Sequence, residues 1–88
     1  MQNELIEAEL RRLALRKADL KEHIVPEFEH QVELLYARIM QMVKSDPHRL
    51  RLEDEYQKLF KELRLRSDEL VRIGQEIEHL ELEKSLKR

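Results

Sequence analysis

The sequence predicts an all-α fold in which two long helices pair as an antiparallel, coiled-coil-like hairpin. Three observations support it: a turn signal near the middle of 88 residues, apolar residues spaced three and four apart on both sides, and abundant Leu, Glu, Lys and Arg. Charged residues make up 41% of the chain, yet the net charge is only -2, so the two signs are interleaved. Interleaved charge is typical of solvated helix faces, not of a nucleic-acid-binding arm or an acidic tail.

The turn signal is the run from Lys44 to Pro47. Asp46 suits a helix N-cap, because its side chain accepts a hydrogen bond from the first turn. Pro47 suits the first helical position, where its missing N–H would have no partner in any case. We therefore expect one helical hairpin over 1–88, with a first arm at about 3–44, a turn at 45–47 and a second arm at about 47–86.

The second arm carries an unbroken heptad pattern. Its inward a and d positions alternate in spacing between three and four residues, which is the pattern of a coiled-coil seam. Most of these residues are apolar, and the exceptions are basic at both ends and in the middle. The positions are Arg49, Leu52, Tyr56, Leu59, Leu63, Arg66, Leu70, Ile73, Ile77, Leu80 and Lys84.

The first arm shows the same pattern with one residue inserted. Ile24, Phe28 and Val32 follow one another at intervals of four residues, where the heptad pattern would alternate three and four. Pro26 lies inside this insertion. Because proline lacks a backbone donor and clashes with the carbonyl four residues back, we expect a kink or a bulge near Pro26. The alternative is a full break, with a new helix starting at Pro26. The inward positions are Ile6, Leu10, Leu13, Lys17, Leu20, Ile24, Phe28, Val32, Leu35, Ile39 and Met42.

Folding the two arms together gives a consistent register. In an antiparallel pair, the residue numbers of facing layers have a constant sum. Here the sum is 91 between the turn and Phe28, and 90 beyond Pro26. Leu35 then faces Tyr56, and Leu13 faces Ile77. Because two patterns that were identified separately agree, the hairpin is the favoured fold.

The two flanks of this hairpin differ in chemistry. On the g-side flank, three acidic residues of the second arm face potential cations of the first. Such pairs contribute little energy but help to set the orientation. The expected pairs are Arg38 with Glu55, His23 with Glu69, and Arg16 with Glu76.

The opposite flank, at the e and b positions, includes a series of apolar or small residues, interrupted by polar ones such as Lys21, Glu53, Gln57 and Arg64. We interpret it as a partner-binding surface; the alternative is tolerated surface residues. We call this surface the e-side face. Its residues are Ala14, Ala18, Val25, Tyr36, Met40, Val43, Leu50, Phe60, Ser67, Val71 and Gly74.

No motif in the chain predicts catalysis, and we expect neither an enzyme nor a bound cofactor. Two Glu-x-x-His motifs, at 27–30 and 76–79, resemble the ligand pattern of di-iron helical bundles. They lie at different levels of the hairpin, so a metal-binding bundle is only a remote alternative. Arg66 lies in the seam, and Glu27 is its expected partner.

The sequence favours a protein–protein interaction or assembly module that acts through the e-side face. The expected partner is a second copy, giving a homodimeric four-helix bundle, or a helix of another protein. A small RNA-binding bundle is the main alternative, because basic residues cluster at 11–17 and 61–66. With no cysteine and no apolar stretch of about 18 residues, we expect a cytoplasmic protein without a membrane segment.

Overall fold

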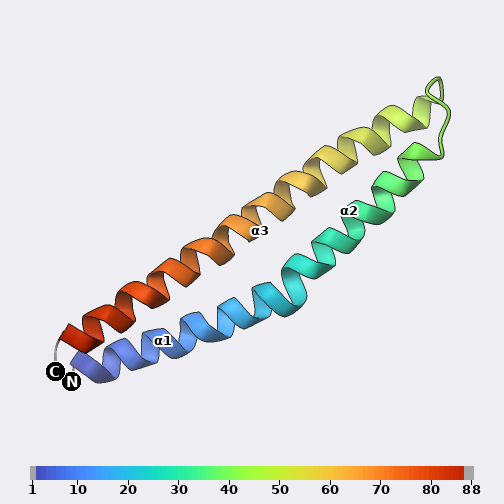
Figure 1. The fold of residues 1–88 in the computed structure, drawn as a ribbon. Helices are drawn as coiled ribbons and strands as arrows, with labels where there is room; N and C mark the ends of the chain where they lie inside the picture. The colour runs from blue at the N-terminus through green and yellow to red at the C-terminus, as the bar shows by residue number, and fades with distance from the viewer. Residues whose placement is uncertain (1, 87–88) are drawn as a thin grey trace.

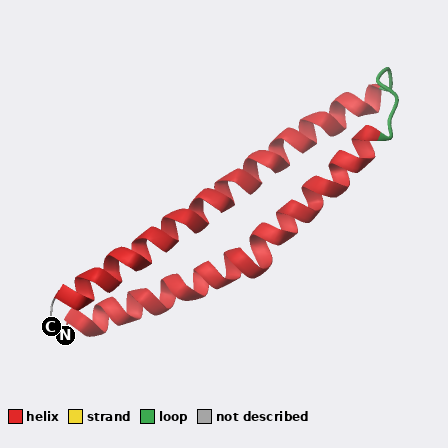
Figure 2. Cartoon of the chain, viewed as in Figure 1, coloured by secondary structure: helices red, strands yellow, loops and turns green. Residues whose placement is uncertain are grey.

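The computed structural model describes residues 2–86, and it is all-helical apart from one loop (Figures 1 and 2). The first arm consists of α1 (Gln2–Asp19), the π-helical turn η1 (Leu20–Ile24) and α2 (Val25–Met40), and the second arm is α3 (Pro47–Leu86). The chain forms a narrow rod of 66 × 15 × 14 Å, with both ends of the described chain at the same tip. The predicted all-α, two-arm hairpin is therefore confirmed.

The start of the second arm follows the capping chemistry of its sequence. Pro47 is the first residue of α3, and the backbone N–H of His48 donates to Oδ1 of Asp46 over 2.9 Å. The carbonyl of Asp46 accepts from the N–H of Arg49 over 3.0 Å and so begins the helical ladder. The N-cap and the first helical position thus agree with the prediction.

The first arm ends earlier than the sequence suggested. Its last helical residue is Met40, and the turn occupies 41–46 instead of 45–47. The N–H of Asp46 donates to the carbonyl of Val43 over 3.0 Å and closes the reversal, while Nη1 of Arg49 donates to the carbonyl of Met42 over 3.0 Å. Continuing the first helix to residue 44 would leave only two residues to cross between the arms, so the last four residues leave the helix.

The seam between the arms contains the residues that the heptad pattern selected. Every predicted a and d residue is buried or half-buried. Leu20 is completely enclosed, and it forms the centre of the core with Leu13 and Ile73. Ile77 packs against this cluster, as the register with Leu13 requires. The polar seam residue Lys84 reaches Glu7 of the first arm over 2.9 Å, so the open end of the hairpin is joined by an ion pair.

The inserted residue of the first arm lies in the π-helical turn. The N–H of Val25 donates to the carbonyl of Leu20, five residues back instead of four. A π turn holds one extra residue, so the seam residues before and after it can both face α3. The backbone is helical on both sides of Pro26, and the alternative of a full break is therefore wrong.

Pro26 and the extra residue both lie at this irregularity, and Pro26→Ala tests their roles separately. The variant regains a backbone donor and loses the ring clash, so the free energy of unfolding should rise by about 1–3 kcal/mol. The π turn should remain, because the extra residue remains. Denaturant unfolding measures the first effect, and NMR contacts between Leu20 and Ile73 measure the second. Loss of those contacts would show that proline alone sets the seam.

Cysteines at the seam test the register. Because the chain has no cysteine of its own, the double variant Leu13→Cys/Ile77→Cys should form a disulfide within one chain on oxidation. Non-reducing electrophoresis and intact mass distinguish this product from a linked dimer. Exclusively intermolecular bonds would indicate an opened hairpin whose arms pair with another molecule.

Candidate partner-binding surface

The e-side face lies outside the seam, and its large apolar side chains are open to solvent. Tyr36, Met40 and Phe60 are 52%, 60% and 46% exposed, respectively. Val43, Leu50 and Val71 are more exposed still. Ala14 and Ala18 are also exposed, whereas Val25, Ser67 and Gly74 are half-buried. Val43 lies in the turn and not in a helix, because the first arm ends at Met40. The residues predicted for this surface are therefore accessible, or lie along its edge with the seam.

Aromatic side chains gather in the half of this face that is nearer the turn. The rings of Tyr36 and Tyr56 are 6.0 Å apart and tilted by 45°, and Tyr56 and Phe60 are also 6.0 Å apart with an angle of 26°. Tyr56 is a half-buried seam residue, so it connects the exposed rings to the core. Such spacings are favourable for aromatic pairs. Phe60 also borders a mainly apolar surface groove with Leu63, Arg64 and Ser67.

Small residues predominate in the other half of the face, which also contains Val71. Ala14 and Ala18 lie on α1, and Ser67 and Gly74 lie on α3. A Cβ atom added at Gly74 would meet nothing within 4 Å, so nothing around it in the chain requires a glycine. A glycine inside a helix costs about 1 kcal/mol relative to alanine. The backbone of α3 is therefore open to close approach at this point.

Six other exposed leucines lie outside the surface that the sequence predicted. They occupy c and f positions of the heptad, outside both the seam and the e-side face, and are scattered over both arms. Isolated apolar residues are common on protein surfaces and carry no specific signal. These residues are Leu5, Leu15, Leu34, Leu65, Leu82 and Leu86.

The g-side flank is charged, but its pairs differ from those predicted. Arg16 donates to Glu69 through Nε and Nη2, over 2.8 and 3.2 Å, and not to Glu76. Arg66 donates to the same carboxylate over 3.3 Å, so Glu69 holds two cations and the predicted pair with His23 is wrong. The hydrogen bonds and charge of Arg16, and then those of Arg66, lower the pKa of Glu69 against a smaller opposing effect of burial.

Arg66 also corrects a prediction about the seam. Its Nη2 lies 3.5 Å from Glu62 on its own helix, where we expected Glu27 of the other arm. Glu27 instead accepts a hydrogen bond from Gln31 over 3.0 Å. Acids three and four residues away along a helix are within easy reach of an arginine, and they satisfy Arg66 without a residue from the other arm.

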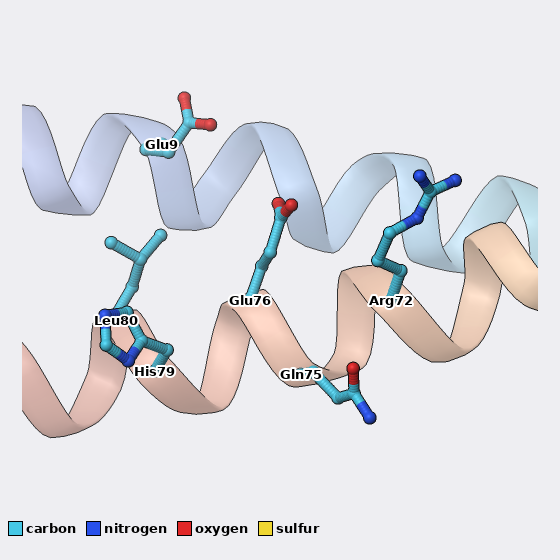
Figure 3. Close-up of a pocket in the computed structure, with 6 residues that line it drawn as sticks. All are labelled: Glu9, Arg72, Gln75, Glu76, His79 and Leu80. Atoms are coloured by element: carbon cyan, nitrogen blue, oxygen red, sulfur yellow. The ribbon is translucent and has the colours of Figure 1, made fainter.

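A shallow groove crosses the charged flank near the open end (Figure 3). Arg72 and Glu76 project from α3 toward α1, whereas Gln75 points away from it. His79 and Glu76 belong to one Glu-x-x-His motif and both line the groove. Within residues 2–86, however, no three His, Asp or Glu side chains are grouped closely enough to hold a metal ion.

Comparison with known proteins identifies no relative: no family model, no curated protein and no solved structure matches the chain. In the part of the chain that the structure describes, no helix is both long and apolar enough to cross a membrane. The surfaces of the hairpin itself are therefore the basis for inferring a function.

The Arg16–Glu69–Arg66 network gives the hairpin a specific pH dependence. Since folding lowers the pKa of Glu69 from its ordinary value of 4.5, its stabilisation is complete at neutral pH. It is lost as the pH falls below that value and through the lower folded one. Glu69→Gln should lower the free energy of unfolding at pH 7 by about 0.2–1 kcal/mol, and should flatten the loss of stability on acidification.

Urea unfolding between pH 3 and 7 measures both effects. The matched control is Glu55→Gln, at an exposed g position, which should keep the wild-type pH dependence. An equally steep acid response in wild type and Glu69→Gln would show that this network contributes nothing to it.

Proposed function

We propose that this chain is a protein–protein interaction or assembly module that associates through its e-side face. The first choice of partner is a second copy, with two hairpins packing into a four-helix bundle. The observation that carries the proposal is the contrast between the flanks. One flank is linked by ion pairs, whereas the other exposes aromatic and aliphatic side chains such as Tyr36, Met40 and Phe60. Apolar surfaces rimmed by polar residues commonly mark interaction sites.

The small size of the core supports an association of this kind. Among the described residues, six apolar side chains are buried and only Leu20 is fully enclosed. Full burial of a large apolar side chain stabilises a fold by about 1.5–3 kcal/mol, whereas ordering each residue's backbone costs about 1–2 kcal/mol. With a single seam, most inward residues are covered from one side only. Packing two e-side faces together would cover the half-buried seam residues from a second direction.

We also propose that the first arm bends at the π turn. Sharp changes of helix direction occur at prolines and at π bulges, and η1 and Pro26 bring both features together. A bend there would curve the first arm around α3, so that the e-side positions before and after it stay on one surface. The bundle and the bend therefore belong to the same proposal.

Binding to nucleic acid is the alternative from a different class. It would require basic side chains that are free to contact phosphates. Arg12 is paired with Glu9, and Arg16 and Arg66 share Glu69. Because carboxylates hold these three cations, fewer basic side chains of the two clusters are free to contact phosphates, and this favours the interaction module over RNA binding. Docking onto a helix of another protein is the second choice within the favoured class.

Substitutions on the two flanks test the proposal. Phe60→Glu and Met40→Glu place a charge in the contact, so each should raise the dimer dissociation constant at least tenfold, which is about 1.4 kcal/mol. Both should also lower helicity at low micromolar concentration, because folding and association are coupled. Glu62→Gln, on the charged flank, is the matched control and should do little.

Light scattering gives the mass, and circular dichroism gives the helicity and the melting temperature. The wild-type melting temperature should rise with protein concentration. A wild-type monomer at high micromolar concentration, together with a Phe60→Glu variant that melts like wild type, would make this face ordinary surface and end the proposal.

A further inference from the structure

The side chains of the e-side face become smaller from the turn toward the open end of the hairpin. On α3, three of its residues follow one another at intervals of seven: Phe60, then Ser67, then Gly74. On the first arm, Tyr36 and Ala14 lie eleven residues to either side of Val25. Both series are bulky toward the turn and small toward the open end. Ser67 and Val25 mark their midpoints.

We propose that the occupant of the e-side face is a second copy of this chain, docked antiparallel so that the two turns lie at opposite ends. The two-fold axis crosses the hairpins at the level of Ser67 and Val25, and Phe60 of each copy sits against Gly74 of the other. This arrangement rests on the proposed function and specifies its partner and orientation. A two-fold contact is isologous, so each such pairing occurs twice.

Shape supports the antiparallel orientation. Phe60 has 46% of its area exposed beside the ring of Tyr56, and the space over Gly74 is empty. Helices pack with their axes about 8–10 Å apart, depending on the side chains in contact. Antiparallel docking places the bulky residues of one copy against the small residues of the other at both ends. The distance between the helix axes of the two copies then stays uniform. A parallel arrangement would place the bulky residues of both copies together at one end and the small residues of both copies together at the other. The axes of the two hairpins would then diverge.

One charged pair on the first arm supports the same orientation. Lys21 and Glu29 lie four residues to either side of Val25, and both are exposed. Within the described part of the chain, neither of them forms an ion pair, unlike Arg16 on the other flank. A two-fold axis at Val25 brings Lys21 of each copy next to Glu29 of the other. This pair of opposite charges on the first arm is therefore complementary between copies. On α3, the same axis sets Glu53, which is paired with Arg49, level with Glu81 of the other copy.

A residue on a two-fold axis meets its own copy, and this gives a direct test. Since the chain contains no cysteine, Ser67→Cys introduces a single thiol. Oxidation at dimer-forming concentration should convert most of this variant to a disulfide-linked dimer on non-reducing electrophoresis. Glu62→Cys, on the charged flank, is the matched control and should stay uncrosslinked. Phe60→Cys mixed with Gly74→Cys should give the mixed disulfide.

Filling the space at Gly74 tests the same contact without a crosslink. Gly74→Leu should raise the dissociation constant at least tenfold, because the added side chain occupies the place of the partner's Phe60. Gly74→Ala is the control for helix propensity. It should increase the helicity of the dissociated hairpin at low concentration while weakening association less than Gly74→Leu.

The outcomes separate this inference from the function on which it rests. A wild-type dimer in light scattering, with no Ser67→Cys crosslink, overturns the antiparallel arrangement and leaves the interaction module standing. In that case Ala14→Cys mixed with Gly74→Cys should crosslink between copies, as parallel docking requires. A monomer at high micromolar concentration overturns both. Dimerisation together with the Ser67→Cys crosslink supports both.

Discussion

The structure depends on keeping one narrow apolar stripe of each helix against the other along a rod of 66 Å. A stripe on an α-helix stays in place only if its residues recur with the period of the helix, and one extra residue displaces every position that follows. The first arm contains such a residue, and the π turn at Leu20–Ile24 holds it. Without that turn, the inward residues of α1 and α2 could not both face α3. The core cluster of Leu13, Leu20 and Ile73 lies beside this adjustment.

A single seam also explains why the flanks differ. Two helices have one line of contact, so the residues beside it either pair with one another in solvent or stay exposed. The g-side flank is of the first kind, because Glu69 holds Arg16 and Arg66 at the edge of the seam. The e-side face is of the second kind, since Phe60 and Tyr36 stay about half exposed although they extend the aromatic contact of Tyr56. The hairpin therefore has one ion-paired flank and one flank with exposed apolar side chains.

The sequence predicted the features that periodicity and local chemistry determine. The inward residues, the Asp46 cap, the start at Pro47 and the region of the irregularity all follow from spacing or from residues that are neighbours in the chain. Errors arose where a long side chain could choose among several partners. Arg16 pairs with Glu69 instead of Glu76, and Arg66 takes acids of its own helix, because heptad positions fix where a side chain starts and not where its guanidinium ends.

The end of the first arm was missed for a related reason. The backbone needs room to cross between helices, and that requirement leaves no mark on the residues 41–44 themselves. The candidate surface could be predicted because it is also periodic. Its occupant could not, since a heptad describes one chain and an interface depends on two.

A glycine at position 74 is unexplained in the single hairpin but would have a role in an assembly of two copies. Within the hairpin it has no steric reason to be glycine, because a Cβ there would meet nothing within 4 Å. It nevertheless carries the helix-propensity cost of about 1 kcal/mol relative to alanine. It is also the only glycine of the chain, and it lies fourteen residues from Phe60 along the same line of α3. No contact within the hairpin compensates for this loss of helix stability. A contact between two copies would compensate for it. The close approach of a second backbone, with a large ring seated on it, is the kind of contact that a glycine permits and an alanine obstructs.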